Sequence, residues 1–329
     1  MVTLKDVAEK AGVTVTTVSR VLNNRGYISE KTRTKVYAVM KELNYQPNEI
    51  ARSLIKKRTN VIGVIVPSVR HPFFCQVVYY LELFAAQNHY KIMLCNSQNE
   101  KEKEFEYVEM LKSNKVAGIV ISSRTTDIDE YLTTDLPVVS FERPTKGDAS
   151  AVLCDNFQGG CLATNHLLEC GCKNLIHIGS PEHEDMPANQ RSVAFSEICN
   201  QHGVAHKTYQ TTEQQFFEQD YRAIINTILD ENPNMDGIFA SNDIIAAQVI
   251  QQCAYRHISI PDTIQVVGFD DIEFASLSSP AITTIKQPVQ QMCELAIRNI
   301  LNRLQDQIVP SKSILPVTLV KRQSTAWSK

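Results

Sequence analysis

The spacing of apolar residues divides the chain near residue 60. Up to that point, apolar positions recur every three or four residues in three short stretches, which is the period of an amphipathic helix. Beyond it, short continuous apolar runs alternate with longer amphipathic stretches. We therefore expect an all-α head followed by a larger α/β body.

Three short helices are predicted in the head. The first begins at a capping-box-like pair, Thr3 and Asp6, and Gly12 supplies the turn that follows it. Thr14 and Ser29 are the expected N-caps of the second and third helices. The inward-facing positions are Leu4, Val7, Ala8, Ala11, Val18, Val21, Leu22, Val36, Val39, Met40 and Leu43. This arrangement indicates a helix-turn-helix, whose second helix enters the major groove of DNA.

A marginal segment follows the head. We expect the third helix to end near Asn44, because Pro47 blocks its continuation. Residues 48–55 are amphipathic but too few to form a stable helix alone, and the basic run 56–58 follows them. The sequence therefore predicts a hinge that folds only when it meets a partner.

Apolar runs predict the strands of the body. They occupy residues 61–66, 90–95, 117–122, 137–141, 174–179, 236–241 and 264–269. Amphipathic stretches such as 73–88 and 100–113 predict helices between them. Continuous apolar strands that alternate with helices are typical of parallel sheets covered on both faces. The two successive series of strands indicate two similar lobes.

Polar and aromatic residues follow several of these strands. Ligands of open α/β sheets bind beyond the carboxyl ends of the strands, so these residues are the candidates for a binding site. They are His71, Phe73, Phe74, Glu142, Arg143, Asn242, Asp243, Asp270 and Asp271, with Arg191 in a nearby helix. Such a set suits a polyhydroxyl compound or a small heterocycle. Structural roles stay open for some of them, since Asn242 can cap a helix and Asp271 can pair locally.

Charge is distributed unevenly along the chain. Residues 1–60 contain twelve Lys and Arg against five Asp and Glu, a net charge of +7, whereas the remainder carries −10. A basic head on an acidic body suggests a polyanionic partner for the head alone.

The composition places the chain among globular proteins, with 43% hydrophobic and 21% charged residues. No signal-peptide-like or membrane-spanning apolar run occurs, so we expect a cytoplasmic protein. The nine cysteines are scattered, which indicates thiols without a disulfide framework. His202 and His206 are four residues apart, but Gly203 and Val204 between them indicate a loop, so we expect no metal site there. Cys170 and Cys172 lack a partner pair at zinc spacing. Because phosphate-binding and nucleophile motifs are also missing, we expect no metal, no cofactor and no enzymatic activity.

The head resembles the LacI/GalR family of transcriptional repressors, through LKDVAEKAGVTVTTVSRVLN and KTRTKVYAVMKELNYQPNEIARSL. The resemblance implies base readout by Val15, Thr16 and Arg20. It implies phosphate or hinge contacts for Thr14, Ser19, Asn23, Tyr45, Asn48 and Arg52. Ala51 and Leu54 match the minor-groove positions of the family's hinge helix, where a leucine wedges a base step.

The body resembles the periplasmic-binding-protein-like sensor of the same family from about Val61 to Thr325. The matching motifs are IGVIVPS, RSVAF, SND, GFDD, TTIKQP and RQST. The implied domains are residues 1–46, a hinge at 47–57 and a body at 58–329. Within the body, the N-lobe takes about 58–157 and 289–316, and the C-lobe about 158–288 and 317–329. The implied effector pocket uses Phe73, Phe74, Glu142, Arg143, Arg191, Phe216, Asn242 and Asp270, with Phe217 as the alternative to Phe216.

The resemblance implies a homodimer that binds palindromic operator DNA and represses an operon of carbohydrate use under allosteric control. RGYISEKTRTKV and HYKIMLCNSQNEKEKEFEYVEML are most similar to repressors of sucrose and fructoside operons in Gram-positive bacteria. We therefore expect a sugar effector, or a sugar phosphate if Arg143 and Arg191 share an anion.

Other functions stay open at this point. One is a catabolite-control-type regulator with a phosphoprotein corepressor, and another is a repressor that responds to purines or nucleosides. A transport binding protein and a sugar-modifying enzyme are disfavoured by the helix-turn-helix and by the absence of catalytic motifs.

Overall fold

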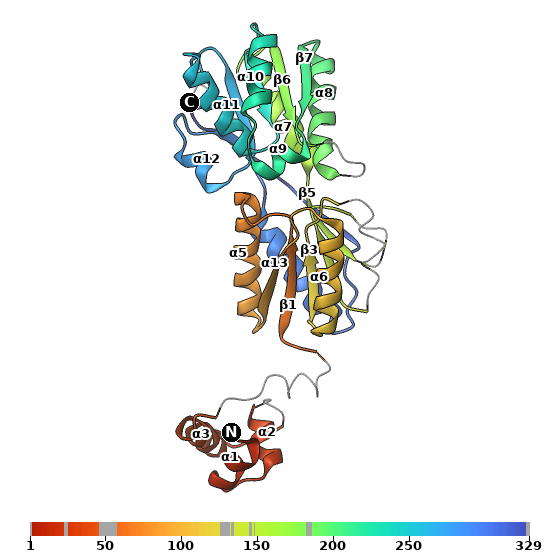
Figure 1. Cartoon of the computed structure of the whole chain (residues 1–329), viewed down its shortest axis with the longest axis vertical. Coiled ribbons are helices and arrows are strands. Elements are labelled where there is room, and N and C mark those ends of the chain that lie inside the picture. Colours follow the sequence, from red (N-terminus) through yellow and green to blue (C-terminus); the bar gives the residue numbers. More distant parts are fainter. Residues whose placement is uncertain are drawn as a thin grey trace. The chain divides into compact units, whose positions relative to one another are not determined.

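The computed structural model describes residues 2–22, 26–45, 58–125, 132, 135–144, 147, 149–181 and 186–326. The chain forms two compact units, Met1–Thr59 and Asn60–Lys329 (Figure 1). The first unit is the head and the second is the body.

The head contains three helices whose ends are set by local sequence. They are α1 (Leu4–Lys10), α2 (Val15–Leu22) and α3 (Glu30–Glu42). Thr3 and Asp6 form the expected capping box at α1, and Ser29 accepts a hydrogen bond from the Thr32 amide at α3. A small core of buried aliphatic side chains, among them Val7, Val18 and Val36, holds the helices together. The prediction of a three-helix head is confirmed.

The N-lobe of the body is built on a six-stranded sheet in the order β11-β5-β4-β3-β1-β2, in which every pair is parallel. Its strands are β1 (Val61–Val66), β2 (Lys91–Asn96), β3 (Gly118–Ile121), β4 (Val138–Phe141), β5 (Ser150–Cys154) and β11 (Lys312–Leu315). Its helices are α5 (Pro72–Gln87), α6 (Lys101–Ser113) and α13 (Val289–Arg303). A Cβ on Gly63 would collide with Leu111 of α6, and one on Gly118 with Ile300 of α13, so these helices approach the sheet closely.

The C-lobe repeats this plan with the order β12-β10-β9-β8-β6-β7. Its strands are β6 (Asn174–Gly179), β7 (Ala205–Gln210), β8 (Gly237–Ala240), β9 (Gln265–Asp270), β10 (Thr283–Lys286) and β12 (Thr318–Val320). Its helices are α7 (Asn156–Glu169), α8 (Gln190–His202), α9 (Glu213–Glu218), α10 (Arg222–Glu231), α11 (Asp243–Tyr255) and α12 (Glu273–Leu277), with a 3-10 turn at Pro187–Asn189. The edge strand β12 runs antiparallel to β10, so the sheet departs from the all-parallel expectation at one edge.

The chain passes between the lobes three times in the described part of the body. β5 of the N-lobe leads into α7 of the C-lobe, β10 leads back into α13, and β11 leads into β12. Neither lobe is therefore a continuous piece of sequence. The crossing segments lie between the two sheets (Figure 1), where they also position residues of the candidate site.

All seven apolar runs identified in the sequence form strands, and the helices expected at 73–88 and 100–113 are α5 and α6. Five strands were not predicted, namely β5, β7, β10, β11 and β12. Three of them, β7, β11 and β12, are edge strands with partly exposed residues. Such strands lack the continuous apolar run that marks a central parallel strand.

Candidate functional site

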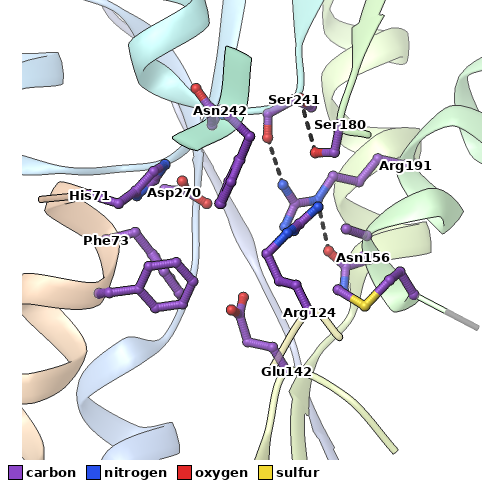
Figure 2. Close-up of a pocket in the computed structure, with 14 residues that line it drawn as sticks. His71, Phe73, Arg124, Glu142, Asn156, Ser180, Arg191, Ser241, Asn242 and Asp270 are labelled. Atoms are coloured by element: carbon purple, nitrogen blue, oxygen red, sulfur yellow. Dashed lines mark hydrogen bonds between the residues drawn. The ribbon is translucent and has the colours of Figure 1, made fainter. Parts of the chain in front are cut away.

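The main candidate site is a pocket between the two lobes (Figure 2). The empty space of this pocket, including its open side, is about 490 Å³. The lining residues are His71, Phe73, Phe74, Arg124, Glu142, Asn156, Ser180, Met186, Ala188, Arg191, Phe216, Ser241, Asn242 and Asp270. Most of these residues follow the carboxyl ends of strands in both sheets. Seven of the eight residues expected from sequence therefore lie around one cavity.

Arg191 is held rigidly in the pocket by its neighbours. Its Nε donates to Asn156 Oδ1 over 2.7 Å, and its Nη1 donates to the Ser241 carbonyl over 2.6 Å. The guanidinium also lies 3.5 Å from the centre of the Phe269 ring. A Cβ on Gly160 of α7 would lie 2.7 Å from the Arg191 carbonyl, so only glycine allows α7 and α8 to approach this closely. The arginine therefore presents a preformed donor set.

Two carboxyl groups provide the acceptors of the pocket. Burial raises the pKa of Glu142 to about 7 and that of Asp270 to about 6, although Arg191 opposes both shifts. Asp270 Oδ1 accepts a hydrogen bond of 2.8 Å from Gln287 Nε2. The backbone has a positive φ at both residues, 67° at Glu142 and 107° at Asp270, a strained conformation that recurs at binding sites.

An aromatic group forms the apolar side of the pocket. His71 stacks on Phe216 with ring centroids 5.3 Å apart and meets Phe74 edge to face at 5.5 Å. Burial, with a smaller contribution from Arg124, lowers the pKa of His71 to about 4, so its imidazole is neutral near pH 7. Neither ring nitrogen has a hydrogen-bond partner in the described residues. His71 therefore adds a neutral ring to the aromatic side of the pocket.

The structure corrects the expectation for Arg143. This residue is not among the pocket-lining residues, because its Nη1 donates to the Thr125 carbonyl. The arginine that does line the pocket on the N-lobe side is Arg124, which follows β3 (Figure 2). The sequence contained a signal for Arg124, since it follows the apolar run 117–122. Phe216 lines the pocket, and Phe217 does not.

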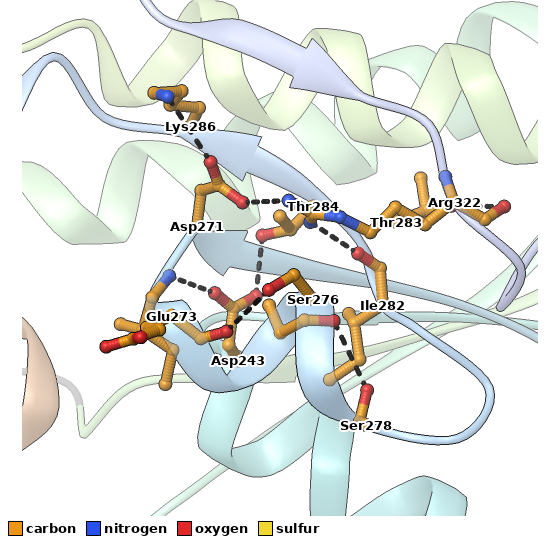
Figure 3. Close-up of polar contacts among 12 residues, drawn as sticks. Asp243, Asp271, Glu273, Ser276, Ser278, Ile282, Thr283, Thr284, Lys286 and Arg322 are labelled. Carbon is orange, nitrogen blue, oxygen red and sulfur yellow. Dashed lines mark hydrogen bonds and ion pairs between the residues drawn. The ribbon is translucent and has the colours of Figure 1, made fainter.

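Asn242, Asp243 and Asp271 have structural roles. Asn242 both lines the pocket and caps α11, since its Oδ1 accepts from the Ile245 amide over 2.8 Å. Asp243 is fully buried and accepts hydrogen bonds from the Thr284 hydroxyl and the Ile272 amide (Figure 3). Asp271 pairs with Arg322 at 2.6 Å and Lys286 at 3.6 Å. Of the adjacent pair, only Asp270 lines the pocket.

The head carries the second candidate site, on the outer face of α2. Val15, Thr16 and Arg20 are exposed, as base-contacting residues must be. Thr14 is exposed as well, and its hydroxyl accepts from the Thr17 amide over 3.1 Å, which caps α2. Ser19 is half-buried.

Of the remaining residues expected to contact DNA, the structure describes Tyr45. Tyr45 is partly buried and packs on the core of the head, so its position also fits a structural role. Asn23, Asn48, Ala51, Arg52 and Leu54 lie outside the described residues.

Two other features of the described residues concern metals and membranes. Among them, no group of three or more His, Cys, Asp or Glu residues is placed to hold a metal ion. None of the helices in the same residues is both long and apolar enough to cross a membrane.

Comparison with protein families gives two matches. Residues 3–48 match the model of bacterial regulatory proteins of the lacI family, and residues 164–325 match a periplasmic binding protein-like domain. The chain is 37% identical to a sucrose operon repressor of Streptococcus mutans over 321 residues, which cover 98% of each protein.

Solved structures agree with these matches. A periplasmic binding protein/LacI transcriptional regulator from Alkaliphilus metalliredigens, complexed with D-xylulofuranose, is 32% identical with a TM-score of 0.74, and covers 82% of this chain and 100% of its own. The lac repressor dimer bound to operator and an anti-inducer is 26% identical with a TM-score of 0.86, over 98% of this chain and 99% of its own.

Proposed function

Because the chain belongs to the LacI family of bacterial regulatory proteins, we propose that it represses an operon of carbohydrate use and releases or binds its operator in response to a small neutral sugar. The observation that carries the proposal is the convergence of Arg191, Glu142, Asp270 and an aromatic face on one pocket between the lobes. We propose that it acts in the cytoplasm, where a bacterial DNA-binding regulator meets its operator.

The head supplies operator recognition. Val15, Thr16 and Arg20 on the outer face of α2 would read base edges in the major groove, with Arg20 suited to guanine. One head covers a half-site, so two heads of a homodimer would bind a palindromic operator. The dimer of the lac repressor on its operator supports this arrangement. The hinge contacts assigned to Ala51, Arg52 and Leu54 remain part of the proposal.

The chemistry of the pocket favours a neutral sugar. Glu142 and Asp270 accept hydrogen bonds from hydroxyl groups, Arg191 donates them, and the Phe73 ring can contact the C–H side of a sugar. A phosphate ester would place its negative charge beside two carboxyl groups. Arg143, which could have shared such an anion with Arg191, is bound to Thr125 instead. Arg124 lines the pocket in its place, but its guanidinium is already paired with Glu213. The D-xylulofuranose complex of the structural relative supports a sugar of monosaccharide size.

Thermal denaturation of the full chain with a panel of sugars tests the proposal. The panel contains D-xylulose, D-ribose, D-fructose, sucrose and the corresponding sugar phosphates. A ligand at a hundredfold excess over its Kd stabilises the native state by about 2.7 kcal/mol. We expect one neutral sugar to raise the Tm and to change operator affinity, measured by fluorescence anisotropy.

Arg191→Ala is the matched variant. It removes the donor set of the pocket and leaves α2 untouched, so we expect the shift in Tm to disappear while operator binding without sugar is kept. Stabilisation by sugar phosphates alone, or chemical conversion of the sugar, would contradict the proposal. Loss of operator binding in the variant without sugar would indicate a structural arginine.

A further inference from the structure

A cluster of five residues joins the two lobes beside the pocket. Asn99, His71 and Arg124 come from the N-lobe, and Glu213 and Phe216 come from helix α9 of the C-lobe. We refer to these residues as the interlobe cluster. Three of its members also line the pocket, whereas Asn99 and Glu213 do not.

Glu213 is the centre of the polar contacts in the interlobe cluster. Its Oε2 accepts a hydrogen bond of 2.6 Å from Asn99 Nδ2, and its Oε1 accepts one of 3.1 Å from Arg124 Nη2. Both donors belong to the opposite lobe. The side chain of Arg124 is only 9% exposed, so its ion pair with Glu213 is shielded from water on one side. A single carboxylate thus spans the boundary between the lobes.

Phe216 adds the apolar contacts. Its ring lies 4.2 Å from the Arg124 guanidinium carbon and stacks on His71 at 5.3 Å. Glu213 and Phe216 are three residues apart on α9, so they share one face of the helix. Their partners follow β1, β2 and β3, which are neighbours in the N-lobe sheet. One face of α9 therefore contacts three loops of the other lobe.

The interlobe cluster is connected to the ligand site through Arg124. The guanidinium contacts Glu213 and the Phe216 ring, while its Nε is buried and has no hydrogen-bond partner among the described residues. Arg124 also lines the pocket, so its guanidinium belongs to both the interlobe cluster and the ligand site. Because Glu213 and the Phe216 ring hold the guanidinium, they fix its position in the pocket lining.

We propose that Glu213 is a positioning residue that locks α9 onto the N-lobe and thereby sets Arg124 and Phe216 for ligand binding. This inference rests on the proposed ligand function of the pocket, but the locking of the lobes can be measured without a ligand. Binding of a ligand to Arg124 stabilises the same lobe arrangement that Glu213 stabilises. Removal of the Glu213 contacts therefore weakens both lobe closure and ligand affinity.

Variants of Glu213 distinguish the locking of α9 onto the N-lobe from a stabilising effect on α9 alone. Glu213 is the first residue of α9, where any negative charge stabilises the helix through its dipole. Glu213→Asp keeps that charge but shortens the side chain by one methylene, so it loses the reach to Asn99 and Arg124. Glu213→Gln removes the charge. Glu218→Gln is the matched control, since Glu218 is exposed on the same helix and accepts a hydrogen bond from Gln214 within it.

Hydrogen exchange of the full chain without sugar is the first measurement. We expect both Glu213 variants to increase exchange in α9 and, together with it, in the loops that follow β2 and β3. Glu218→Gln should leave the N-lobe loops unchanged. Increased exchange in α9 alone, or wild-type behaviour of Glu213→Asp, would overturn the proposal, because either result assigns Glu213 only to its own helix.

Affinity for D-xylulose, measured by calorimetry, is the second measurement. We expect both Glu213 variants to bind it about fivefold or more weakly than the wild type, at the lower end of typical couplings between sites. Unchanged affinity with altered exchange would overturn the link to the pocket. If D-xylulose does not bind the wild type, the choice of sugar fails, and the exchange experiment alone decides the role of Glu213.

Discussion

At the scale of single residues, the pocket combines groups whose protonation is shifted in opposite directions. Burial raises the pKa of Glu142 and Asp270, and burial lowers the pKa of His71 to about 4. Near pH 7 His71 is therefore neutral and Glu142 is partly protonated, so these groups keep hydrogen-bonding atoms without a full charge. A neutral polyhydroxyl ligand is favoured in such surroundings.

The shift at Glu142 predicts how stability depends on pH. Its pKa in the folded chain, about 7, lies above the ordinary value of 4.5. The contribution of Glu142 to the free energy of unfolding is therefore fully present below pH 4.5 and is lost as pH rises through 7. Glu142→Gln removes this loss. Relative to the wild type, the variant should gain about 2 kcal/mol in free energy of unfolding between pH 4.5 and pH 8, after allowance for partial exposure.

Urea denaturation followed by circular dichroism at several pH values measures this difference. The histidines with lowered pKa values produce the opposite trend, but they are present in both proteins and cancel in the comparison. Parallel stability profiles for the two proteins would show that Glu142 ionises normally in the folded chain.

At the scale of elements, the sequence correctly predicted several helix ends and central strands, because these depend on the local pattern of residues. The caps of α1 and α3 follow from Thr3 and Ser29, and central strands such as β1 follow from continuous apolar runs. The edge strand β7 was missed because most of its residues are polar and all of them are at least partly exposed.

The pocket was predicted less from pattern than from the family resemblance. Arg124 and His71 both follow strands, but nothing local distinguishes them from Arg143, which also follows a strand. The direction of a side chain depends on long-range contacts, such as the one between Arg143 and Thr125.

The prediction at this scale concerns operator binding by helix α2. Arg20 is exposed on its outer face, so Arg20→Ala should weaken binding to a palindromic operator selected from a random library by about 1–3 kcal/mol. Binding to unrelated DNA should change little, because phosphate contacts carry most of it. Fluorescence anisotropy at fixed salt measures both affinities.

Lys31→Ala is a suitable control for this experiment, since Lys31 is an exposed cation on α3. An equal loss of affinity for operator and unrelated DNA in Arg20→Ala would assign Arg20 to phosphate contact instead of base readout.

At the scale of the whole molecule, the proposed dimer requires a surface on the body. One groove is lined by Arg70, Pro72, Cys75, Gln76, Tyr79, Tyr80, Ile272, Glu273, Phe274 and Leu277, which come from α5 and the region of α12. Tyr79, Phe274 and Leu277 are 62%, 49% and 71% exposed. Such a collection of exposed apolar side chains marks a protein interface, and we assign it to a second copy of this chain.

Leu277→Asp tests this assignment. A charge in the groove should shift the protein from dimer to monomer in sedimentation velocity and weaken binding to a palindromic operator. Ile308→Asp changes a fully exposed apolar residue outside the groove and should leave the dimer intact. A dimer that persists in Leu277→Asp would place the interface elsewhere.

The three passages between the lobes have a consequence for the order in which the protein is made. Strands β11 and β12 lie at edges of the two sheets, yet they are formed by residues 312–320, close to the end of the chain. A ribosome therefore releases a complete head long before either lobe can close its sheet. A chain that stops before residue 312 therefore keeps the head but lacks an edge strand of each sheet.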